Sequence, residues 1–521
     1  MAMKTYRCIL PAALLAWVEL LSCSGSLAAT TVQFVAADPS GACDGSFTTV
    51  NTTSGALRAC VSGLWQKTGG GNGVLSVSAL PATCTPENGS SNLFFLSSGA
   101  RGVYGCTSVN TWTPVGISTV FVTNYPSLNA ALAAAGFNAE VVVPSGYTAT
   151  LRSKLALNGL NLTLRCETGS MIIKGFDGDL MQVTGANIAI DGCTMDGARI
   201  AHNGGMIMVD NAVGLLIKNC TIENGADTAL SMFMAFGALV TGNKMVGNLG
   251  CPIFAQDFLN QIEIAGNAVD SSAVIAPEGV DTIGVHTYLA GGTATNISIH
   301  DNTIVHGGNN FAIEVGGFGP NSLPPSGVVI RSNQITLGIP SNGGISLSTV
   351  NNGTVGNNAI DAQGHVINID GVELVSTNGV SATYNTVKNT AFGATYTVAV
   401  NGGSNNTVSN NVFAGGIYMG TSRVQSPNVN GNIIQNNVLT APTGAVFPRG
   451  LIWLQCNTTN CSVSRNLITG NTLGGNGSGP GINFENDYGT GMMDSNNAGG
   501  NQVTGASIGI NIGPNVTNTN Q

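Results

Sequence analysis

The tripeptide Asn302-Thr303-Ile304 is one copy of the pattern that decides the fold. The pattern is a small polar residue, any residue and then an apolar residue, and it returns at intervals of 23 to 35 residues. Repeats of this period predict a solenoid in which each repeat forms one coil. The polar positions, called the Asn ladder below, are Cys193, Cys220, Asn243, Asn267, Asn302, Asn333, Asn358, Asn385, Asn411, Asn437, Asn471 and Asn501.

A second repeated pattern is an apolar-x-apolar triplet, which is typical of a β-strand with one face toward a core. About 25 residues accommodate three short strands and three turns, and stacked coils place equivalent residues about 4.8 Å apart. We expect each ladder Asn to take the left-handed conformation at a bend and to bond to the Asn residues above and below it. The triplets include Ile283-Gly-Val285, Ile313-Glu-Val315, Ile345-Ser-Leu347, Ile367-Asn-Ile369 and Val398-Ala-Val400.

A leucine-rich repeat has a similar period and also contains Asn. The apolar residues here are Ile and Val rather than Leu, and no helical pattern recurs within the repeat. These differences favour a β-solenoid.

The composition restricts the class of protein. Only 8% of the 521 residues are charged, 43% are hydrophobic, and there are 72 glycines. Few charges with many Ile and Val residues suit a solenoid with polar, uncharged turns and argue against a disordered chain. The formal net charge is −9 and no basic patch occurs, so we expect no nucleic-acid partner.

The N-terminus predicts export. Residues 1–28 contain Lys4 and Arg7, then an apolar run over Ile9–Leu21 and a small-residue cleavage site, as in a secretory signal peptide. The residues around Cys23 also approximate a lipoprotein cleavage box, which leaves a lipid anchor at Cys23 as an alternative. No later apolar run is long enough to span a membrane, so we expect a secreted or cell-surface protein.

Residues 29–116 lack the ladder and predict a small β module. Cys43 with Cys60, and Cys84 with Cys106, are predicted to staple two short hairpins, because units this small bury little core. The module is interpreted as a spacer or cap, or alternatively as a glycan-binding unit that uses its tryptophans.

The remaining cysteines fall within the solenoid. Cys166 is a first, imperfect rung of the ladder, and Cys193 and Cys220 replace Asn on adjacent rungs. We interpret Cys193 and Cys220 as core fillers or as a stacked disulfide. Cys456 and Cys461 are predicted to form a disulfide within one loop.

Residues 117–521 begin with a strand at 118–123 and an Ala-rich helix at 126–135, which would cover the open end of the first coil. Two strands are predicted within 140–151. With the Asn ladder, the helix and the following Val141-Val-Val-Pro-Ser-Gly-Tyr147 resemble the right-handed parallel β-helix family of the pectin-lyase-like superfamily. The resemblance implies an all-β solenoid of about 13 coils with a short N-terminal capping helix.

That family includes polysaccharide lyases, glycoside hydrolases, epimerases, esterases, tailspikes and adhesins, so the resemblance implies no single activity. The polygalacturonase-like motifs are absent, because no Asp-Asp pair occurs and Gly364-His365-Val366 breaks the Gly-His-Gly motif. No clear Asp cluster supports calcium, and we predict no cofactor. The spacing of His286, His300 and His306 also does not predict a metal site.

Outward-facing positions of the triplet strands should line up from coil to coil and form a groove, flanked by insertions at 270–281 and 316–326. His286 and Glu314 would act there as base and acid for β-elimination next to a uronate, or as an acid/base pair for hydrolysis. Arg331 would neutralise a substrate carboxylate. The predicted catalytic residues are His286, Glu314 and Asp370, and the predicted substrate-binding residues are Tyr288, Asn368, Arg331 and Gln256.

Two functional hypotheses follow. The first is a secreted carbohydrate-active enzyme, a polysaccharide lyase or glycoside hydrolase. The second is a non-catalytic surface or secreted β-helix protein that binds glycans or serves as an adhesin or spacer. Both hypotheses predict a monomer whose partner is a polysaccharide or a cell-surface glycan.

Overall fold

The structure is a computed structural model. It describes the strands β1–β8 and then the chain from Ser118 onward, with gaps at 136–137, 201–204, 275–279, 339–342, 365–369, 391–395, 422–426 and 488–489. The predicted signal peptide, Cys23 and the side chains of the four cysteines predicted to pair within 29–116 lie outside the described residues. Among the described residues, no helix has the length and apolar character needed to cross a lipid bilayer.

The chain divides into two compact units. The smaller contains two four-stranded sheets, in the orders β1-β2-β3-β4 and β5-β6-β7-β8. Their strands are β1 (Thr31–Val35), β2 (Phe47–Asn51), β3 (Leu57–Val61), β4 (Leu64–Lys67), β5 (Val74–Val77), β6 (Leu93–Leu96), β7 (Gly102–Ser108) and β8 (Thr111–Pro114).

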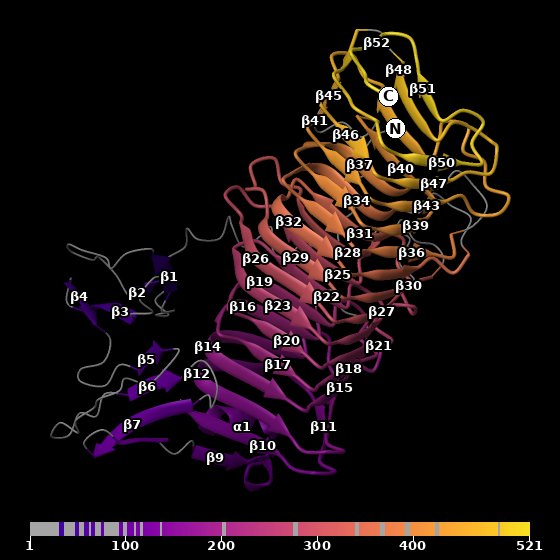
Figure 1. The fold of residues 1–521 in the computed structure, drawn as a ribbon. Helices are drawn as coiled ribbons and strands as arrows, with labels where there is room; N and C mark the ends of the chain where they lie inside the picture. Colours follow the sequence, from indigo (N-terminus) through magenta and orange to yellow (C-terminus); the bar gives the residue numbers. More distant parts are fainter. Residues whose placement is uncertain are drawn as a thin grey trace. The chain divides into compact units, whose positions relative to one another are not determined.

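The larger unit is a stack of coils in which parallel strands pair with the coils before and after them (Figure 1). Three rows of strands run along the stack. The first row contains β16 (Ile207–Val213), β19 (Leu230–Phe236), β22 (Ile253–Gln256), β25 (Ile283–Thr287), β28 (Phe311–Gly317), β31 (Gly343–Ser348), β34 (Asp370–Asn378), β37 (Tyr396–Ser404), β40 (Gly416–Gly420), β44 (Ile452–Cys456), β48 (Ile482–Asn486) and β51 (Ile510–Ile512).

The second row follows the first within each coil. It contains β17 (Leu216–Lys218), β20 (Leu239–Thr241), β23 (Leu259–Ala265), β26 (Ala294–His300), β29 (Ser326–Arg331), β32 (Asn351–Gly356), β35 (Ser381–Thr383), β38 (Thr407–Ser409), β41 (Asn428–Asn430), β42 (Ile433–Gln435), β45 (Ser462–Ser464), β46 (Leu467–Thr469), β49 (Met492–Asp494) and β52 (Val516–Thr517). The long strands β12 (Leu155–Cys166) and β14 (Met181–Asp191) precede both rows.

The third row is a 14-stranded sheet that follows the Asn ladder. Its strands are β11 (Thr148–Leu151), β13 (Met171–Lys174), β15 (Thr194–Asp196), β18 (Thr221–Glu223), β21 (Lys244–Val246), β24 (Ala268–Asp270), β27 (Thr303–His306), β30 (Gln334–Leu337), β33 (Ala359–Asp361), β36 (Thr386–Lys388), β39 (Val412–Ala414), β43 (Val438–Thr440), β47 (Thr472–Gly474) and β50 (Gln502–Thr504).

From Asn243 to Asn501, the Asn ladder is a continuous chain of side-chain hydrogen bonds. Asn302, which is fully buried, donates from Nδ2 to Asn333 Oδ1 at 3.0 Å and to the Ile264 carbonyl oxygen at 2.9 Å. The left-handed conformation falls on the residue before each rung, as at Asp301 (φ 56°), and not on the ladder Asn, so that part of the prediction is wrong. The preceding residue makes the bend, which leaves the Asn side chain free to point inward and satisfy buried polar groups.

A second ladder, which the sequence patterns missed, begins at Asn406, just before β38, and continues to the C-terminal coils. In it Asn432 Nδ2 donates to Asn466 Oδ1 at 3.1 Å, and Asn466 Nδ2 donates to Asn496 Oδ1 at 3.0 Å. Its first member, Asn406, accepts the backbone N–H of Val380. Two buried ladders therefore fix the coil-to-coil register of the C-terminal half.

The first coil begins with β9 (Ser118–Phe121), a 3₁₀ turn at Val122–Asn124 and helix α1 (Leu128–Ala135), followed by β10 (Ala139–Val143). The predicted helix is confirmed, although α1 starts two residues later than expected. Leu128 and Leu132 lie on its buried side, and α1 contacts β12.

The disulfides differ from one expectation. Cys166 and Cys193 on adjacent coils form a disulfide with a Cα–Cα distance of 4.8 Å. Cys220 is free and buried, so a disulfide between Cys193 and Cys220 is ruled out. Adjacent coils bring Cys193 close to both Cys166 and Cys220, but the sulfur of Cys193 can form only one disulfide. Cys456 and Cys461 form a second disulfide.

One predicted triplet is out of register. Ile345-Ser-Leu347 pairs with Val372-Glu-Leu374, and not with Ile367-Asn-Ile369. Val372 and Leu374 are fully buried, so this later triplet fills the core. Asn368 lies outside the described residues. Glu373 therefore occupies the outward position predicted for Asn368.

Candidate functional site

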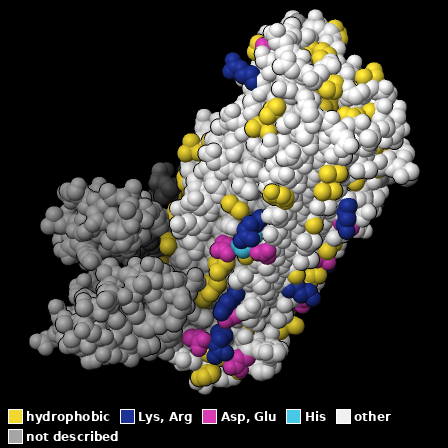
Figure 2. Space-filling model, viewed as in Figure 1, with side chains coloured by type: hydrophobic (Ala, Val, Ile, Leu, Met, Phe, Trp, Pro, Cys, Tyr) yellow, Lys and Arg dark blue, Asp and Glu magenta, His cyan; other side chains and the backbone are white. Residues whose placement is uncertain are grey.

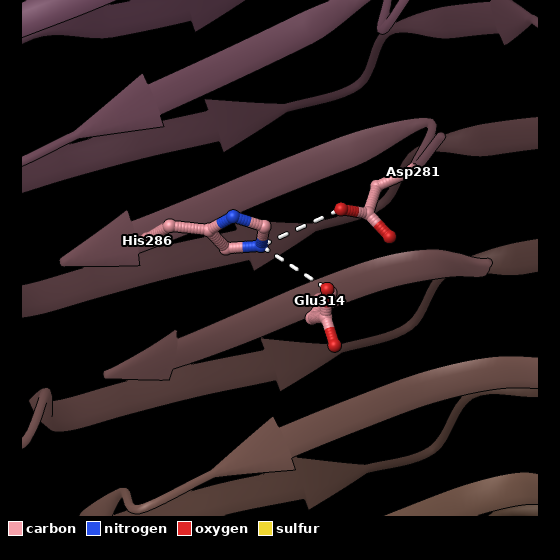
Figure 3. Close-up of side chains that lie close together, drawn as sticks. All are labelled: Asp281, His286 and Glu314. Carbon is pink, nitrogen blue, oxygen red and sulfur yellow. Dashed lines mark ion pairs between the residues drawn. The ribbon is translucent and has the colours of Figure 1, made fainter. Parts of the chain in front are cut away.

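Three side chains on or just before first-row strands come together, and we call them the acidic–histidine cluster: Asp281, His286 and Glu314. His286 Nε2 lies 3.4 Å from Asp281 Oδ2 and 3.3 Å from Glu314 Oε2 (Figure 3). Glu314 is on the neighbouring coil, where it pairs with Gly284; a Cβ at Gly284 would lie only 3.2 Å from Asp281 Oδ2, so the glycine leaves room for that carboxyl group. The structure thus brings together His286 and Glu314, as the coil spacing predicts.

Sequence reasoning missed Asp281 and also Asn310, whose side-chain amide bridges two members of the cluster. Asn310 Nδ2 donates to Asp281 Oδ1 at 2.7 Å and to Glu314 Oε2 at 2.8 Å. The backbone N–H of Phe311 also donates to Asp281 Oδ1, at 3.3 Å. Both residues come just before a first-row strand, a position that the triplet pattern did not include.

His306 supports the cluster through its hydrogen bond to Asn310. Its Nε2 donates to the carbonyl oxygen of Asn310 at 3.1 Å, and the Thr282 hydroxyl donates to its Nδ1 at 2.8 Å. Burial lowers the pKa of His306 to about 4, so the ring is neutral near pH 7. A neutral ring with both nitrogens hydrogen-bonded holds Asn310 in position.

The ring of His286 is held between aromatic side chains. Phe254 and Phe318 meet it edge to face, with centroids 5.3 and 4.7 Å away. The Tyr288 hydroxyl lies 2.7 Å from Nδ1. His286 Nε2, by contrast, is buried and makes no hydrogen bond, because neither nearby carboxylate oxygen has hydrogen-bond geometry.

The two carboxyl groups have different surroundings. Burial raises the pKa of Asp281 well above its usual range, and the charge of Glu314 acts in the same direction. The side chains of Asp281 and His286 are only 1% and 3% exposed, whereas that of Glu314 is 11% exposed. Glu314 is therefore the member of the cluster that solvent reaches.

Tyr288 belongs to a loop that Asp257 anchors. The carboxylate of Asp257 accepts the backbone N–H groups of Tyr288, at 2.7 Å, and Leu289, at 3.0 Å. Gln256, the neighbouring residue, pairs directly with His286 and is 6% exposed. Tyr288 and Gln256 thus lie beside His286, as the alignment of coils predicts.

Two predicted site residues lie elsewhere. Asp370 pairs with Gly343 at the start of β34, while Val375 occupies the position in line with His286, so the predicted alignment of Asp370 is wrong. Arg331 is on β29 in the second row, 3.8 Å from Asp301. Asp370 is out of line because the later triplet Val372-Glu-Leu374 fills the core in its coil. Arg331 is away from the cluster because the turn between the two rows puts it on β29.

A second group of polar and aromatic residues lies farther along the first row. Trp453 pairs with Tyr418, and their ring centroids are 4.9 Å apart. Trp453 Nε1 donates to Glu485 at 2.8 Å, and the Arg449 guanidinium lies 4.6 Å above the Trp453 ring. Burial raises the pKa of Glu485, and the charge of Asp487 adds to the effect while that of Arg449 opposes it.

The visible surface is mostly uncharged. Figure 2 shows one face of the molecule, on which charged side chains are few and lie in small groups among uncharged ones. This agrees with the 8% charged residues of the whole chain. Recognition by such a surface depends mainly on hydrogen bonds and aromatic contacts.

Residues 166–323 match a family model described as the right handed beta helix region. The fold is a right-handed parallel β-helix. The parallel three-row coils described above extend this architecture beyond the matched residues, as the resemblance to the pectin-lyase-like superfamily implies. A search of curated protein sequences finds no match.

Solved structures with a similar fold share little sequence with this chain. The tailspike protein of E. coli bacteriophage HK620 with a pentasaccharide is 13% identical, with a TM-score of 0.47 and coverage of 75% of each chain. A DFA-IIIase from Arthrobacter chlorophenolicus is 13% identical, with a TM-score of 0.42 and coverage of 70% of this chain and 95% of the other. A mannuronic acid specific family 6 lyase from human gut microbiota is 12% identical, with a TM-score of 0.38 and coverage of 73% and 86%.

Proposed function

We propose that this chain is an exported enzyme that hydrolyses glycosidic bonds of an extracellular glycan at the acidic–histidine cluster. The observation that carries the proposal is the pair of carboxyl groups, Asp281 and Glu314, held by one amide of Asn310 beside His286. Paired carboxyl groups are the usual machinery of glycoside hydrolysis.

The two carboxyl groups act as a unit in this proposal. Burial and the charge of Glu314 raise the pKa of Asp281 well above its usual range, so the pair holds one proton in this proposal, and Glu314 is the member that a substrate can touch. The pair donates that proton to the glycosidic oxygen as the C–O bond breaks. A water molecule then adds its hydroxyl to the anomeric carbon and returns a proton to the pair, so that no proton is gained or lost.

A neutral glycan fits the cluster better than a uronate. Elimination next to a uronate requires a cation to neutralise the sugar carboxylate, and Arg331, predicted for that role, pairs with Asp301 in the second row. A uronate would instead meet the carboxyl groups of Asp281 and Glu314. Like charges at close range disfavour such binding.

The group around Trp453 supports a glycan as the ligand. Trp453 and Tyr418 are on the same row as Glu314, and Glu485 and Asp487 offer acceptors for hydroxyl groups. Apolar ring faces combined with a few polar groups suit sugars, which have apolar C–H faces and polar edges. A chain lying along the first row would contact this group and the cluster together.

A non-catalytic glycan-binding protein is the second candidate. The observation that favours it is the low exposure of Asp281 and His286, since a catalytic group must reach its substrate. In this case the first row would hold a glycan without cleaving it.

The test is an activity panel. Purified protein is incubated with neutral polysaccharides, such as xylan, arabinan, β-glucan and fructan, and with polygalacturonate and alginate. New reducing ends without ultraviolet-absorbing unsaturated sugars are the expected result. An unsaturated product would show that the reaction is elimination and not hydrolysis. Binding without any product would favour the non-catalytic candidate.

A further inference from the structure

We infer that the acidic–histidine cluster binds one divalent transition-metal ion, with zinc as the ion that fits best. The ligand atoms are Asp281 Oδ2, His286 Nε2 and Glu314 Oε2, which lie within 4.8 Å of one another. The inference rests on the proposed function for its role in catalysis, but metal binding itself can be measured without any substrate.

The first observation is the state of His286 Nε2. The atom is buried and points between two carboxylate oxygens, yet it makes no hydrogen bond with either. A buried polar atom without a partner destabilises the folded protein. A metal ion between the three groups removes this destabilisation, because the nitrogen lone pair then has an acceptor.

The second observation is the spacing of the ligand atoms. Zinc bonds of about 2.0–2.1 Å in a tetrahedron place neighbouring ligand atoms about 3.3–3.4 Å apart. The two measured distances from His286 Nε2 are 3.4 Å to Asp281 and 3.3 Å to Glu314. The side chains therefore hold two edges of a zinc tetrahedron without rearrangement.

The ligand chemistry selects among metals. Imidazole nitrogen suits zinc and other late first-row metals, whereas calcium and magnesium prefer oxygen ligands only. Two carboxylates and one imidazole neutralise a divalent charge. Three protein ligands leave a fourth position open, as in catalytic zinc sites.

The surroundings hold these ligands in place. The Tyr288 hydroxyl lies 2.7 Å from His286 Nδ1, and a proton on Nδ1 donated to that hydroxyl leaves Nε2 free to bind metal. Asn310 donates to Asp281 Oδ1, the oxygen that does not face His286. Partners of this kind orient metal ligands and set their protonation.

A bound metal would change the source of the attacking group. A zinc ion held by Asp281, His286 and Glu314 would displace the proton of the carboxyl pair and would lower the pKa of a water in the open position to about 7, which would supply a hydroxide for attack on the anomeric carbon. The proton lost by that water would go to solvent, and the leaving oxygen would take its proton from solvent.

The experiment is a zinc titration of tag-free protein stripped with a chelator, followed by isothermal calorimetry. We expect one zinc per chain. His286→Ala and Glu314→Gln should each weaken binding by at least about 100-fold, and Tyr288→Phe by about 10- to 100-fold. Crystals soaked in zinc should give an anomalous peak between the three side chains.

The matched control is His300→Ala. His300 also lies between two carboxylates, Glu263 at 3.2 Å and Asp301 at 2.6 Å, but both of these are hydrogen-bonded and largely exposed. This variant should bind zinc like the parent. Circular dichroism on every variant separates loss of the site from loss of the fold.

Three results would overturn the inference: no zinc bound by the folded parent protein, a site that survives both His286→Ala and Glu314→Gln, or an anomalous peak elsewhere. Glycan cleavage by protein that binds no zinc rejects the metal and leaves the proposed function intact. Zinc bound without cleavage of any glycan rejects the proposed function and leaves the metal site intact.

Discussion

His286 Nε2 lies 3.3 Å from Glu314 Oε2 on the next coil, and the two atoms do not form a hydrogen bond. The stacking of parallel coils creates this relationship, because Glu314 is aligned with Gly284, two residues before His286. A buried imidazole and a partly exposed carboxylate thus face one another on an otherwise weakly charged surface.

Substituting either His286 or Glu314 should abolish most of the glycan hydrolysis. We expect Glu314→Gln and His286→Ala each to lower the rate of glycan hydrolysis by about 10²- to 10⁴-fold, the usual contribution of a general acid or base. Reducing-end release measures the rate. His300→Ala is the control, and a rate near that of the parent in Glu314→Gln would place the chemistry elsewhere.

Trp453 should contribute to binding rather than to chemistry. Trp453→Ala should weaken the affinity for a long glycan about 5- to 10-fold, since one aromatic contact supplies about 1 kcal/mol or slightly more. Its effect on cleavage of a short oligosaccharide should be small. Affinity electrophoresis measures the first effect, and an unchanged mobility shift would exclude Trp453 from the glycan path.

The Asn ladder should be a major source of stability. Asn333→Ala removes the acceptor for two N–H groups of Asn302, one from its side chain and one from its backbone, and should cost about 1–3 kcal/mol. The thermal midpoint measures this loss. Asn321→Ala, at an exposed position, should change stability by less than about 0.5 kcal/mol. Equal midpoints for the two variants would contradict the assigned role of the ladder.

The Cys166–Cys193 disulfide should contribute more than the Cys456–Cys461 disulfide. The separations are 27 and 5 residues, and loop-closure entropy gives about 3–4 kcal/mol for the first and about 2 kcal/mol for the second. Double serine variants of each pair, melted under oxidising conditions, test the order. The reverse order would show that strain or residual structure outweighs chain entropy.

His306 should make stability depend on pH. Its pKa of about 4 in the folded protein is below the ordinary value of 6.5, so protonation favours the unfolded chain. Its contribution is fully present above pH 6.5, falls as pH drops toward 4, and the total loss is about 3 kcal/mol. Unfolding of the parent and of His306→Gln across this range measures it, and parallel pH profiles would reject the assignment.

Much of the fold is readable from local sequence. The period of the ladder and the alternating triplets predict parallel coils, because a buried Asn and an inward Ile must recur once per coil. The alignment of coils also predicts that His286, Glu314, Tyr288 and Gln256 lie together. Composition and the ladder suffice for this, since each coil contacts only its neighbours.

The tertiary structure alone decided the details that depend on turn lengths. Asp281 and Asn310 meet from segments outside the repeated pattern. Asp370 is out of line with the cluster because Val372-Glu-Leu374, and not Ile367-Asn-Ile369, pairs with the preceding coil. The pairing of Cys166 with Cys193 was likewise open among adjacent rungs. The sequence by itself determined the coil and its inward side chains, because burial repeats at every turn. Which outward groups meet depends on how each variable turn sets the register of the next strand, and that is a property of the assembled stack.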